Sequence, residues 1–303
     1  MALKNTAIEK RLVIVVGPTA VGKTAMSIQL AQQYRCPILS FDSRQFYQEM
    51  AIGTARPTSE ELAAAKHYFV GNRTTETRYT AGMFEKDALL QLEQIFKEHN
   101  TCIAVGGSGL YINALAFGID NIPASEEVRK ALDKRWKNEG LEVLQEEVKM
   151  IDPEYYSSAD MQNPRRVMRA LEAYQISGKK LSDLRKKEQK KRPFKMEWFG
   201  LNLPRPTLFN RINERVDLMM EAGLEKEAEK LLPLRERKAL KTVGYRELFD
   251  YFDGTHSKER AVELIKRNTR IYAKRQITWF EKNEAVQWFN PTDFPKIIEE
   301  LEK

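Results

Sequence analysis

Residues 17–24 read GPTAVGKT and directly follow the apolar run RLVIVV. The segment fits the pattern G-x-x-x-x-G-K-[ST], in which glycines turn backbone N–H groups toward a phosphate and the following helix adds its positive end. The Lys23 side chain supplies a mobile positive charge, and the Thr24 hydroxyl can ligate Mg²⁺. The pattern predicts phosphate binding but leaves open a hydrolysed nucleotide, a phosphoryl-donating nucleotide or another diphosphate. The residues expected to bind are Gly17, Pro18, Thr19, Ala20, Val21, Gly22, Lys23 and Thr24.

A carboxylate follows the next apolar run along the chain, in PILSFDSRQFYQEM. Asp42 and Ser43 should therefore lie at the carboxyl edge of a parallel sheet, where α/β folds bind substrates. Asp42 there could bind Mg²⁺, accept a proton from a nucleophile or only cap a turn. Motor and switch NTPases usually have a second strand that ends in a carboxylate. The run CIAV ends instead in GGSGLY, so the sequence indicates no hydrolytic apparatus.

Two further loops are expected at the same edge. The segment MAIGTARPT offers the Thr54 hydroxyl and the Arg56 cation. The segment VGGSGLYINAL repeats the strand, glycine and helix design, with Ser108 leading the helix. A lone GGSG could be a tight turn, but two glycine loops and Asp42 at one edge favour a shared site.

Strand and helix patterns alternate over the first 120 residues, which predicts a parallel sheet covered on both faces. From about residue 122 the periodicity is helical, and Asn163 followed by proline is a good helix start. Residues 196–203 should return as a strand. The expected strands are Leu12–Val16, Pro37–Phe41, His67–Val70 and Cys102–Val105, and the expected helices are Lys23–Gln33, Ser59–Ala65, Ala81–His99 and Ser257–Phe280.

The expected fold class is therefore α/β, with a P-loop NTPase-like parallel-sheet core and a helical insertion domain. The core is expected to comprise residues 1–120 and 196–303. The basic helical insertion is expected at residues 121–195. Residues 179–195 contain nine Lys/Arg and two acids, and this run is either a solvated helix face or a grip on an RNA backbone.

The composition is that of a globular protein, with 42% hydrophobic and 31% charged residues among 303. The net charge of +7 fits a polyanionic partner or simply a lysine-rich surface. Cys36 and Cys102 each begin an apolar stretch and are expected as buried, reduced thiols. The three scattered histidines argue against a histidine-built metal site. With no signal core and no run of 18 apolar residues, the cytoplasm is the expected location, with no membrane partner.

Together the segments resemble the tRNA dimethylallyltransferases. The matching pieces, in the family's order, are GPTAVGKT, DSRQFYQEMAIGTARPT, VGGSGLYINAL, NPRRVMRALE, KTVGYREL and YAKRQITWF. The resemblance implies that the loop holds the diphosphate of dimethylallyl diphosphate with Mg²⁺. It implies transfer of the dimethylallyl group to the exocyclic amine of the adenosine immediately 3′ of the anticodon in tRNA, with release of diphosphate. It also suggests a monomer or weak dimer of the bacterial, zinc-free type.

The resemblance also assigns roles to residues. Asp42 would be the general base, with Ser43 beside it contacting the flipped base. Ser108 stands where many members carry threonine, and Arg56 stands where lysine is common. Arg215 would lie near the diphosphate, although spacing alone equally allows a solvent-facing helix arginine. The expected catalytic set is Asp42, Lys23, Thr24, Ser108 and Arg215, with Thr24 as the metal ligand.

By the same resemblance, three short segments and two single residues would contact tRNA. The arginines suit phosphates, but RRVMRALE could equally be an amphipathic helix with Val167, Leu171 and Tyr174 in a core. Tyr272 and Trp279, farther along, are expected more as core residues than as base-stacking ones. The full set of expected contacts is Asp42, Ser43, Arg44, Gln45, Ser108, Arg129, Arg165, Arg166, Val167, Met168, Arg169, Lys241, Thr242, Val243, Gly244, Tyr245 and Arg246.

Three other activities remain open on the residues alone. One is an isopentenyltransferase for free adenine nucleotides, and another is a P-loop small-molecule kinase. The third is a non-catalytic RNA binder, in which Asp42 would have no task. The basic helical region argues for a large RNA substrate over a free nucleotide.

Overall fold

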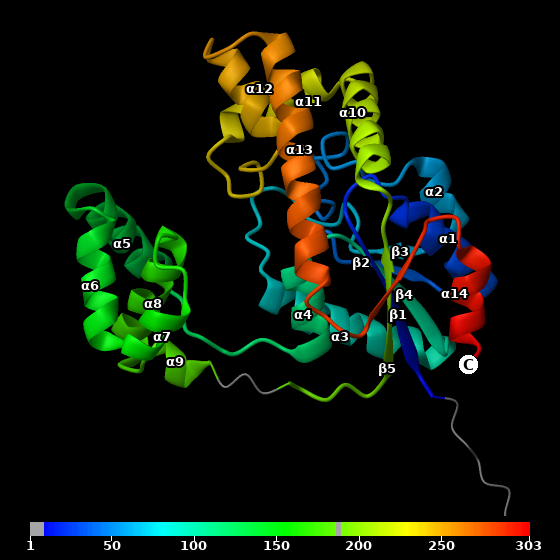
Figure 1. Ribbon diagram of the computed structural model, residues 1–303, viewed down its shortest axis with the longest axis horizontal. Helices are drawn as coiled ribbons and strands as arrows, with labels where there is room; N and C mark the ends of the chain where they lie inside the picture. Colours follow the sequence, from blue (N-terminus) through cyan, green and yellow to red (C-terminus); the bar gives the residue numbers. More distant parts are fainter. Residues whose placement is uncertain (1–8, 186–188) are drawn as a thin grey trace, which may run out of the picture. The chain divides into compact units, whose positions relative to one another are not determined.

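The computed structural model describes residues 9–185 and 189–303. Two compact units separate in it: a core unit, Met1–Ala116 with Lys191–Lys303, and a helical unit, Phe117–Lys190 (Figure 1). The sequence predicts the boundaries at 121 and 195, so residues 117–120 and 191–195 fall in the other unit. The first eight residues and residues 186–188 of the basic run lie outside the described residues.

The core unit contains a six-stranded sheet in which every pairing is parallel, with the order β3-β2-β4-β1-β5-β6. This confirms the α/β fold class. Two details differ from prediction: β3 has only two residues, and β6 was not predicted. The strands are β1 (Arg11–Val16), β2 (Ile38–Ser40), β3 (His67–Tyr68), β4 (Thr101–Val105), β5 (Lys195–Leu201) and β6 (Val286–Phe289).

In the core unit, each strand is followed along the chain by one or more helices. The Ser257 hydroxyl accepts a hydrogen bond from the Arg260 N–H and caps the longest of them, α13, where the sequence predicts its start. The helices are α1 (Lys23–Gln33), α2 (Ser59–Ala64), α3 (Ala81–Glu98), α4 (Gly109–Phe117), α10 (Arg205–Glu221), α11 (Leu224–Leu231), the 3₁₀ helix η1 (Leu232–Leu234), α12 (Tyr245–Phe252), α13 (Lys258–Phe280) and α14 (Phe294–Leu301).

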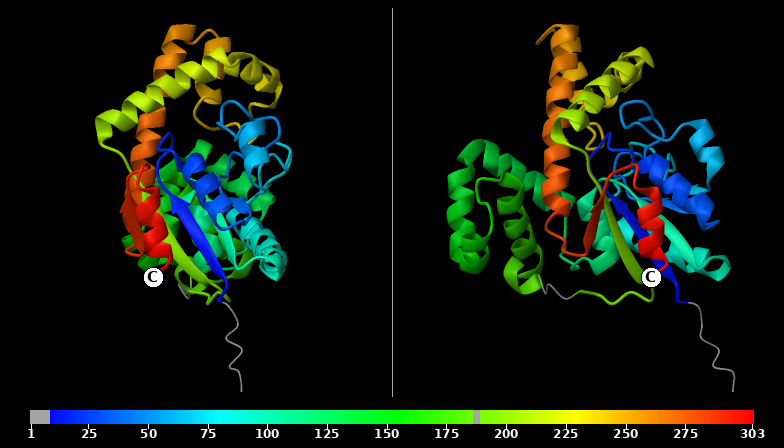
Figure 2. Two further views of the ribbon diagram at one scale, coloured as in Figure 1. Left: turned by 90° about the vertical axis from the view of Figure 1, so that its right-hand side faces the viewer. Right: turned by 45° about the vertical axis from the view of Figure 1, so that its right-hand side comes forward.

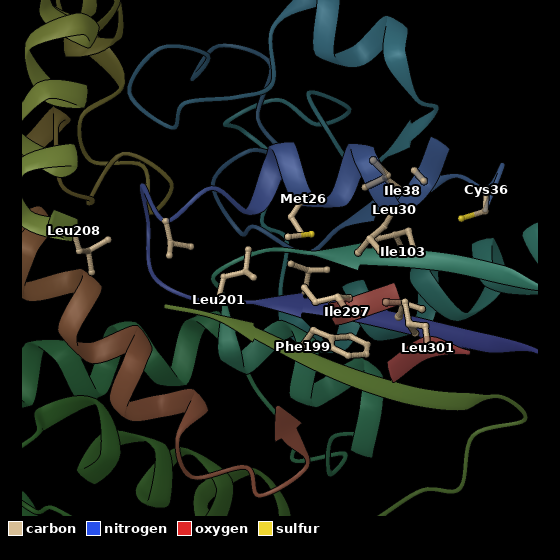
Figure 3. Packing of buried hydrophobic residues seen from close by; sticks show 14 of the residues in the cluster. Met26, Leu30, Cys36, Ile38, Ile103, Phe199, Leu201, Leu208, Ile297 and Leu301 are labelled. Carbon is tan, nitrogen blue, oxygen red and sulfur yellow. The ribbon is translucent and has the colours of Figure 1, made fainter. Parts of the chain in front are cut away.

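One hydrophobic cluster joins the sheet to the helices on one of its faces (Figure 3). Val13 and Val15 of β1 point into it, while Leu12 and Ile14 point to the opposite face and are equally buried. Burial on both faces is typical of a parallel sheet and explains the continuous apolar runs in the sequence. The helix residues that pack in this cluster are Met26 and Leu30 of α1, Leu208 and Ile212 of α10, and Ile297 and Leu301 of α14.

A second cluster holds α10, α11, α12 and α13 together. Helices α10 and α13 extend away from the sheet and pack against each other (Figure 2). Buried residues from all four helices meet there, so this part of the core unit has a core of its own. They include Val216, Leu224, Leu231, Leu248, Phe249 and Ile265.

The helical unit packs around Leu132, Leu144, Val148, Val167 and Leu171. Helix α8 begins as the sequence predicts, because Asn163 accepts a hydrogen bond from the Arg165 N–H and proline occupies the first turn. The helices are α5 (Glu126–Glu139), α6 (Leu141–Ile151), α7 (Pro153–Ser158), α8 (Pro164–Ser177) and α9 (Leu181–Leu184).

Cys36 and Cys102 are free, buried thiols, as predicted. Burial raises the pKa of Cys102 and raises that of Cys36 to about 12, so both stay protonated near neutral pH. Across the described ranges of the chain, no helix combines the length and the apolar character that a membrane span requires.

Candidate active site

The phosphate loop connects the buried end of β1 to the start of α1. Gly17 has φ +144, and a Cβ there would lie 2.5 Å from the Leu201 carbonyl oxygen. Gly22, directly before α1, has φ +110. Both positions require glycine, because an L side chain is strained at these φ values. The loop therefore turns sharply and presents the N-terminus of α1 to the space above the sheet edge.

That space is a cavity of about 1000 Å³, formed within the core unit. Its walls come from the phosphate loop, the loops after β2 and β4, and helices α10 and α13. The cavity brings together most of the predicted site residues of the core unit. Those that line it are Thr19, Ala20, Gly22, Lys23, Thr24, Asp42, Ser43, Arg44, Gln45, Ser108, Arg215, Thr242, Val243 and Gly244.

The Lys23 ammonium donates a hydrogen bond to the Pro18 carbonyl at 2.7 Å, within its own loop. Burial lowers the pKa of Lys23 to about 8, the Asp42 carboxylate opposes that change, and the Arg215 cation adds to it. The ligand-free cavity therefore lowers the preference of Lys23 for its charged form, which is lost only as the pH rises above about 8. An anion bound here would restore that preference.

Arg215 of α10 points into this cavity, so the solvent-facing alternative is wrong. Burial lowers the pKa of its guanidinium, while Asp42 and Glu61 oppose that change. Arg211, one turn earlier, also lines the cavity and donates to the Val21 carbonyl at 3.5 Å. The sequence did not single out Arg211. The spacing of four residues that places it on the same helix face as Arg215 could have indicated it.

Asp42 follows Phe41, the first residue after β2, and its carboxylate accepts the Arg44 N–H at 3.0 Å. Its neighbour Ser43 is bound to the second glycine loop. The Ser43 N–H donates to the Ser108 hydroxyl at 2.9 Å, and that hydroxyl donates to Ser43 Oγ at 3.0 Å. The two loops that follow β2 and β4 are therefore joined at Ser43, the residue next to Asp42.

Gln45 organises the next loop rather than pointing freely into the cavity. Its side-chain amide donates to the carbonyls of Thr54 and Ala55 at 3.2 and 3.0 Å. Thr54 and Arg56 line the cavity, as expected from their position at this edge. The Arg56 guanidinium also donates to the Gln48 carbonyl at 3.1 Å.

Helix α13 contributes Tyr272, Gln276 and Trp279 to the cavity wall. The expectation that the two aromatic residues are core residues is wrong, since they are 40% and 44% exposed. Although the residue as a whole is partly exposed, desolvation of its phenol group and the nearby Asp42 carboxylate raise the pKa of Tyr272. Trp279 lies so close over Gly109 that a Cβ there would be 2.0 Å from the indole nitrogen. Gln276 was not predicted as a site residue, although its helical spacing from Tyr272 and Trp279 places the three on one face of α13.

The residues present fit Mg²⁺ as a partner of a bound phosphate. Thr24 and Asp42 place hard oxygen donors on the cavity wall. Within the described part of the chain, no group of three or more His, Cys, Asp or Glu could hold a metal. Mg²⁺ is typically held by one or two protein oxygens together with substrate phosphates and water, which suits so small a donor set.

In the helical unit, the predicted RNA-binding arginines differ in availability. The side chain of Glu172 is 2% exposed and takes hydrogen bonds at 2.8 Å from Arg129 and Arg169. Arg165 and Arg166 are exposed on the surface of α8. Val167 and Met168, which the resemblance placed among the tRNA contacts, are 0% and 8% exposed and pack in the core. Their side chains therefore face away from any RNA bound on the surface.

The segment 241–246, also predicted to contact tRNA, likewise contains both exposed and buried side chains. Tyr245 is fully buried, and its ring lies against Gly53. Lys241 and Arg246 are exposed, where Lys241 pairs with Glu236 at 2.9 Å. The middle of the segment reaches the cavity and the two cations face solvent, while the tyrosine supports the loop beneath.

Residues 45–283 match a family model described as IPP transferase. A curated tRNA dimethylallyltransferase from Cytophaga hutchinsonii is 46% identical over 296 residues, which is 97% of this chain and 97% of the relative. A tRNA dimethylallyltransferase from Flavobacterium johnsoniae is 46% identical over 297 residues, 95% of this chain and 96% of the relative.

Solved structures with the same fold carry related descriptions. The tRNA isopentenylpyrophosphate transferase of Bacillus halodurans superposes with a TM-score of 0.70 at 36% identity, covering 97% of this chain and 94% of its own. A eukaryotic dimethylallyltransferase acting on tRNA gives a TM-score of 0.77 at 25% identity, covering 95% of this chain and 75% of its own. Sequence and fold thus point to one enzyme family.

Proposed function

Because this chain belongs to the IPP transferase family, we propose that it transfers a dimethylallyl group from dimethylallyl diphosphate to the exocyclic amine of the adenosine immediately 3′ of the tRNA anticodon. It is a tRNA-modifying prenyltransferase, in keeping with its relatives. The observation that carries the finer proposal is the single cavity in which the phosphate loop, Asp42 and Arg215 meet. A phosphate site beside the Asp42 carboxylate suits a diphosphate leaving group and an amine nucleophile.

In the proposed reaction the adenine amine forms a bond to the first carbon of the allylic chain as the bond from that carbon to the diphosphate oxygen breaks. Asp42 accepts the proton that the amine loses. Lys23, Arg215 and the N–H groups at the start of α1 stabilise the negative charge on the departing diphosphate. Thr24, with Asp42 nearby, would hold Mg²⁺, which supplies further charge neutralisation on the diphosphate when bound.

Ser43 and Ser108 would position the extruded adenine beside Asp42. An enzyme that modifies a base inside a folded RNA must take that base out of its stack. We propose that the exposed cations Arg165, Arg166 and Arg246 contact the tRNA backbone, where positive charge gives affinity without reading sequence. Arg129, Arg169 and Lys241 pair with acids, as does Arg246 with Glu247 at 3.6 Å, and these cations would still add to the positive potential that attracts the tRNA backbone. The helical unit would thus serve tRNA binding. The cavity is built within one chain, so we propose a monomer, acting in the cytoplasm where its substrate is.

The test mixes the purified protein and Mg²⁺ with unmodified tRNA, using labelled dimethylallyl diphosphate in one reaction and γ-labelled ATP in another. We expect label to move from the isoprenoid to tRNA in the wild-type protein and not in Asp42→Ala. Asp42→Asn should bind tRNA like the wild type, since it keeps the shape of the side chain but cannot accept a proton.

Two results would contradict the proposal. Transfer to free AMP but not to tRNA would favour an enzyme for adenine nucleotides. Movement of only the ATP label would mean that the loop binds a nucleotide and that the protein is a kinase. Among residues 9–185 and 189–303, no specific contact favours either alternative over transfer to tRNA.

A further inference from the structure

The side-chain amide of Gln276 bridges the two glycine loops of the cavity. Its Oε1 accepts the backbone N–H of Thr19, in the phosphate loop, at 2.9 Å. Its Nε2 donates to the backbone carbonyl of Gly107, in the loop after β4, at 2.9 Å. The residue is 5% exposed, so water competes little for either bond. Both hydrogen-bonding groups of the amide are used, one on each loop.

The fit around this amide is close. A Cβ at Gly107 would lie 2.0 Å from Gln276 Nε2, so the amide occupies the space that any side chain at position 107 would need. Helix α13 approaches the loop again one turn later, where Trp279 lies against Gly109. The helix is therefore in direct contact with the second glycine loop at two points.

The contacts continue from this amide to the carboxylate of the site. Gly107 is followed by Ser108, whose hydroxyl takes the Ser43 N–H at 2.9 Å and donates to Ser43 Oγ at 3.0 Å. Ser43 adjoins Asp42 in the chain. A continuous path of hydrogen bonds and short backbone steps therefore runs from the phosphate loop through Gln276 to the loop that carries Asp42. No other side chain of the described residues is seen to bond to both glycine loops.

We propose that Gln276 is a positioning residue that fixes the distance between the diphosphate-binding loop and the acceptor side of the cavity. This inference rests on the proposed function. A displacement reaction needs the amine, the allylic carbon and the departing oxygen in one line, and a misplacement of about 1 Å can slow such a step by about a hundredfold. The diphosphate of the prenyl donor would bind one loop, and the general base Asp42 lies beside the other. The Gln276 amide between the two loops therefore sets this alignment.

The experiment compares Gln276→Met, which removes both bonds at similar volume, with Gln276→Glu, which keeps the acceptor for Thr19 but loses the donor to Gly107. The matched control is Gln287→Met, on the exposed side of β6. For each protein the single-turnover rate at saturating substrates, the affinity for tRNA and the urea stability are measured. The affinity for inorganic diphosphate with Mg²⁺ is measured by calorimetry without tRNA.

We expect Gln276→Met to lower the single-turnover rate by about tenfold to a hundredfold, with tRNA affinity unchanged and Gln287→Met equal to the wild type. A carboxyl at position 276 regains a donor when it is protonated. The rate of Gln276→Glu relative to the wild type should therefore rise as the pH is lowered toward about 6. A role limited to stability would leave the rate per folded molecule unchanged in both variants.

Equal single-turnover rates for Gln276→Met and the wild type would overturn the inference. If Gln276→Met does not fold, a Gln276→Glu rate that equals the wild type at every pH overturns it instead. Absence of transfer by the wild-type protein would refute the proposed function and not the role of Gln276. Diphosphate affinity then decides: weaker binding to Gln276→Met than to Gln287→Met supports the positioning role, and equal binding overturns it.

Discussion

The hydroxyl of Tyr245 donates a hydrogen bond to the Glu227 carboxylate at 2.7 Å. The same carboxylate accepts the backbone N–H groups of Ala51, Ile52 and Gly53 at 2.9, 2.8 and 2.9 Å. One acidic side chain on α11 thus holds three consecutive amides of the loop that leads into the cavity wall. The ring of Tyr245 closes over the last of them.

We predict that Tyr245→Phe lowers the free energy of unfolding by about 1.5–3 kcal/mol, because it removes a hydrogen bond to a charged group in a buried site. Urea denaturation measures the change, with Tyr251→Phe on the same helix as the control. Glu227→Ala should be worse, since three half-buried backbone N–H groups lose their acceptor together with the Tyr245 hydroxyl. Wild-type stability in Tyr245→Phe would show that the bond does not hold the loop.

The activity should fall as the pH rises above about 8. Burial lowers the pKa of Lys23 to about 8, with Asp42 opposing and Arg215 adding to the change, so the free enzyme loses this positive charge there. A bound diphosphate favours the charged lysine, so kcat should persist to higher pH than kcat/KM for the donor. Initial rates across pH test this, with Lys23→Arg expected to flatten the alkaline limb. Parallel profiles for the two constants would contradict it.

Lys23→Met should abolish diphosphate binding yet stabilise the ligand-free protein by roughly 1–3 kcal/mol near neutral pH. The folded pKa of about 8 lies below the value of 10.5 in an unfolded chain, so folding near neutral pH buries an unfavourable charge. For the same reason, wild-type stability should rise between about pH 8 and 10.5 relative to the variant. Thermal unfolding at several pH values measures both effects. A less stable Lys23→Met at every pH would show that the bond to Pro18 outweighs the burial.

The paired arginines of the helical unit should act mainly on stability. Burial opposes a low pKa for Glu172, but hydrogen bonds from Arg129 and Arg169 hold its pKa below the usual value. The stabilisation that these hydrogen bonds provide is present at pH values above the pKa of a glutamate in the unfolded chain. It is lost as the pH falls through the lowered pKa of Glu172 in the folded protein. Glu172→Gln should therefore cost about 1.5–3 kcal/mol at neutral pH and less in acid, because the half-buried arginines Arg129 and Arg169 lose a shared, buried carboxylate acceptor. Chemical denaturation at two pH values tests it, and an equal loss at both would contradict this account.

Arg165 and Arg166 should act mainly on tRNA affinity. Replacing both with alanine is expected to weaken binding uniformly across tRNAs. The slope of log affinity against log salt should fall by about one for each lost phosphate contact. Unfolding should be unchanged, since both side chains are exposed. Lys130→Ala on α5, which removes an exposed cation paired with Glu126, is the control. An unchanged salt slope would place the RNA elsewhere.

Local patterns explain why part of the site could be predicted. The phosphate loop and Asp42 each follow an apolar strand, and parallel strands end at a common edge, so neighbouring sequence is enough to place them. For Arg215 the sequence left two alternatives, a place near the diphosphate or a solvent-facing one, because the side of α10 that faces the cavity depends on how this helix packs. The strand β6 was missed because four residues with one buried position carry little periodicity.

The contacts that join the loops could not be predicted, because their partners are distant in the chain. Gln276 bonds to residues 257 and 169 positions away, and Glu227 bonds to a loop 174–176 positions away. Helical spacing can place Gln276 on one face with Tyr272 and Trp279, but it does not indicate which loops the amide bonds to, and no local pattern marks Glu227. At Val167 and Met168 the matched motif predicted tRNA contacts where the structure has core residues. A matched helical segment includes the face that packs in the core as well as the face that can meet a ligand.

The order of strands in the sheet has a consequence for synthesis on the ribosome. Strand β1 is central and pairs with β4 on one side and β5 on the other, and the whole helical unit is translated between β4 and β5. Until β5 emerges, the apolar strand β1 has an unpaired edge that can pair with other chains. The helical unit, with its own core, can fold during this interval. Chains released early, before residue 195, should therefore be the aggregation-prone form of this protein and the one that needs chaperones.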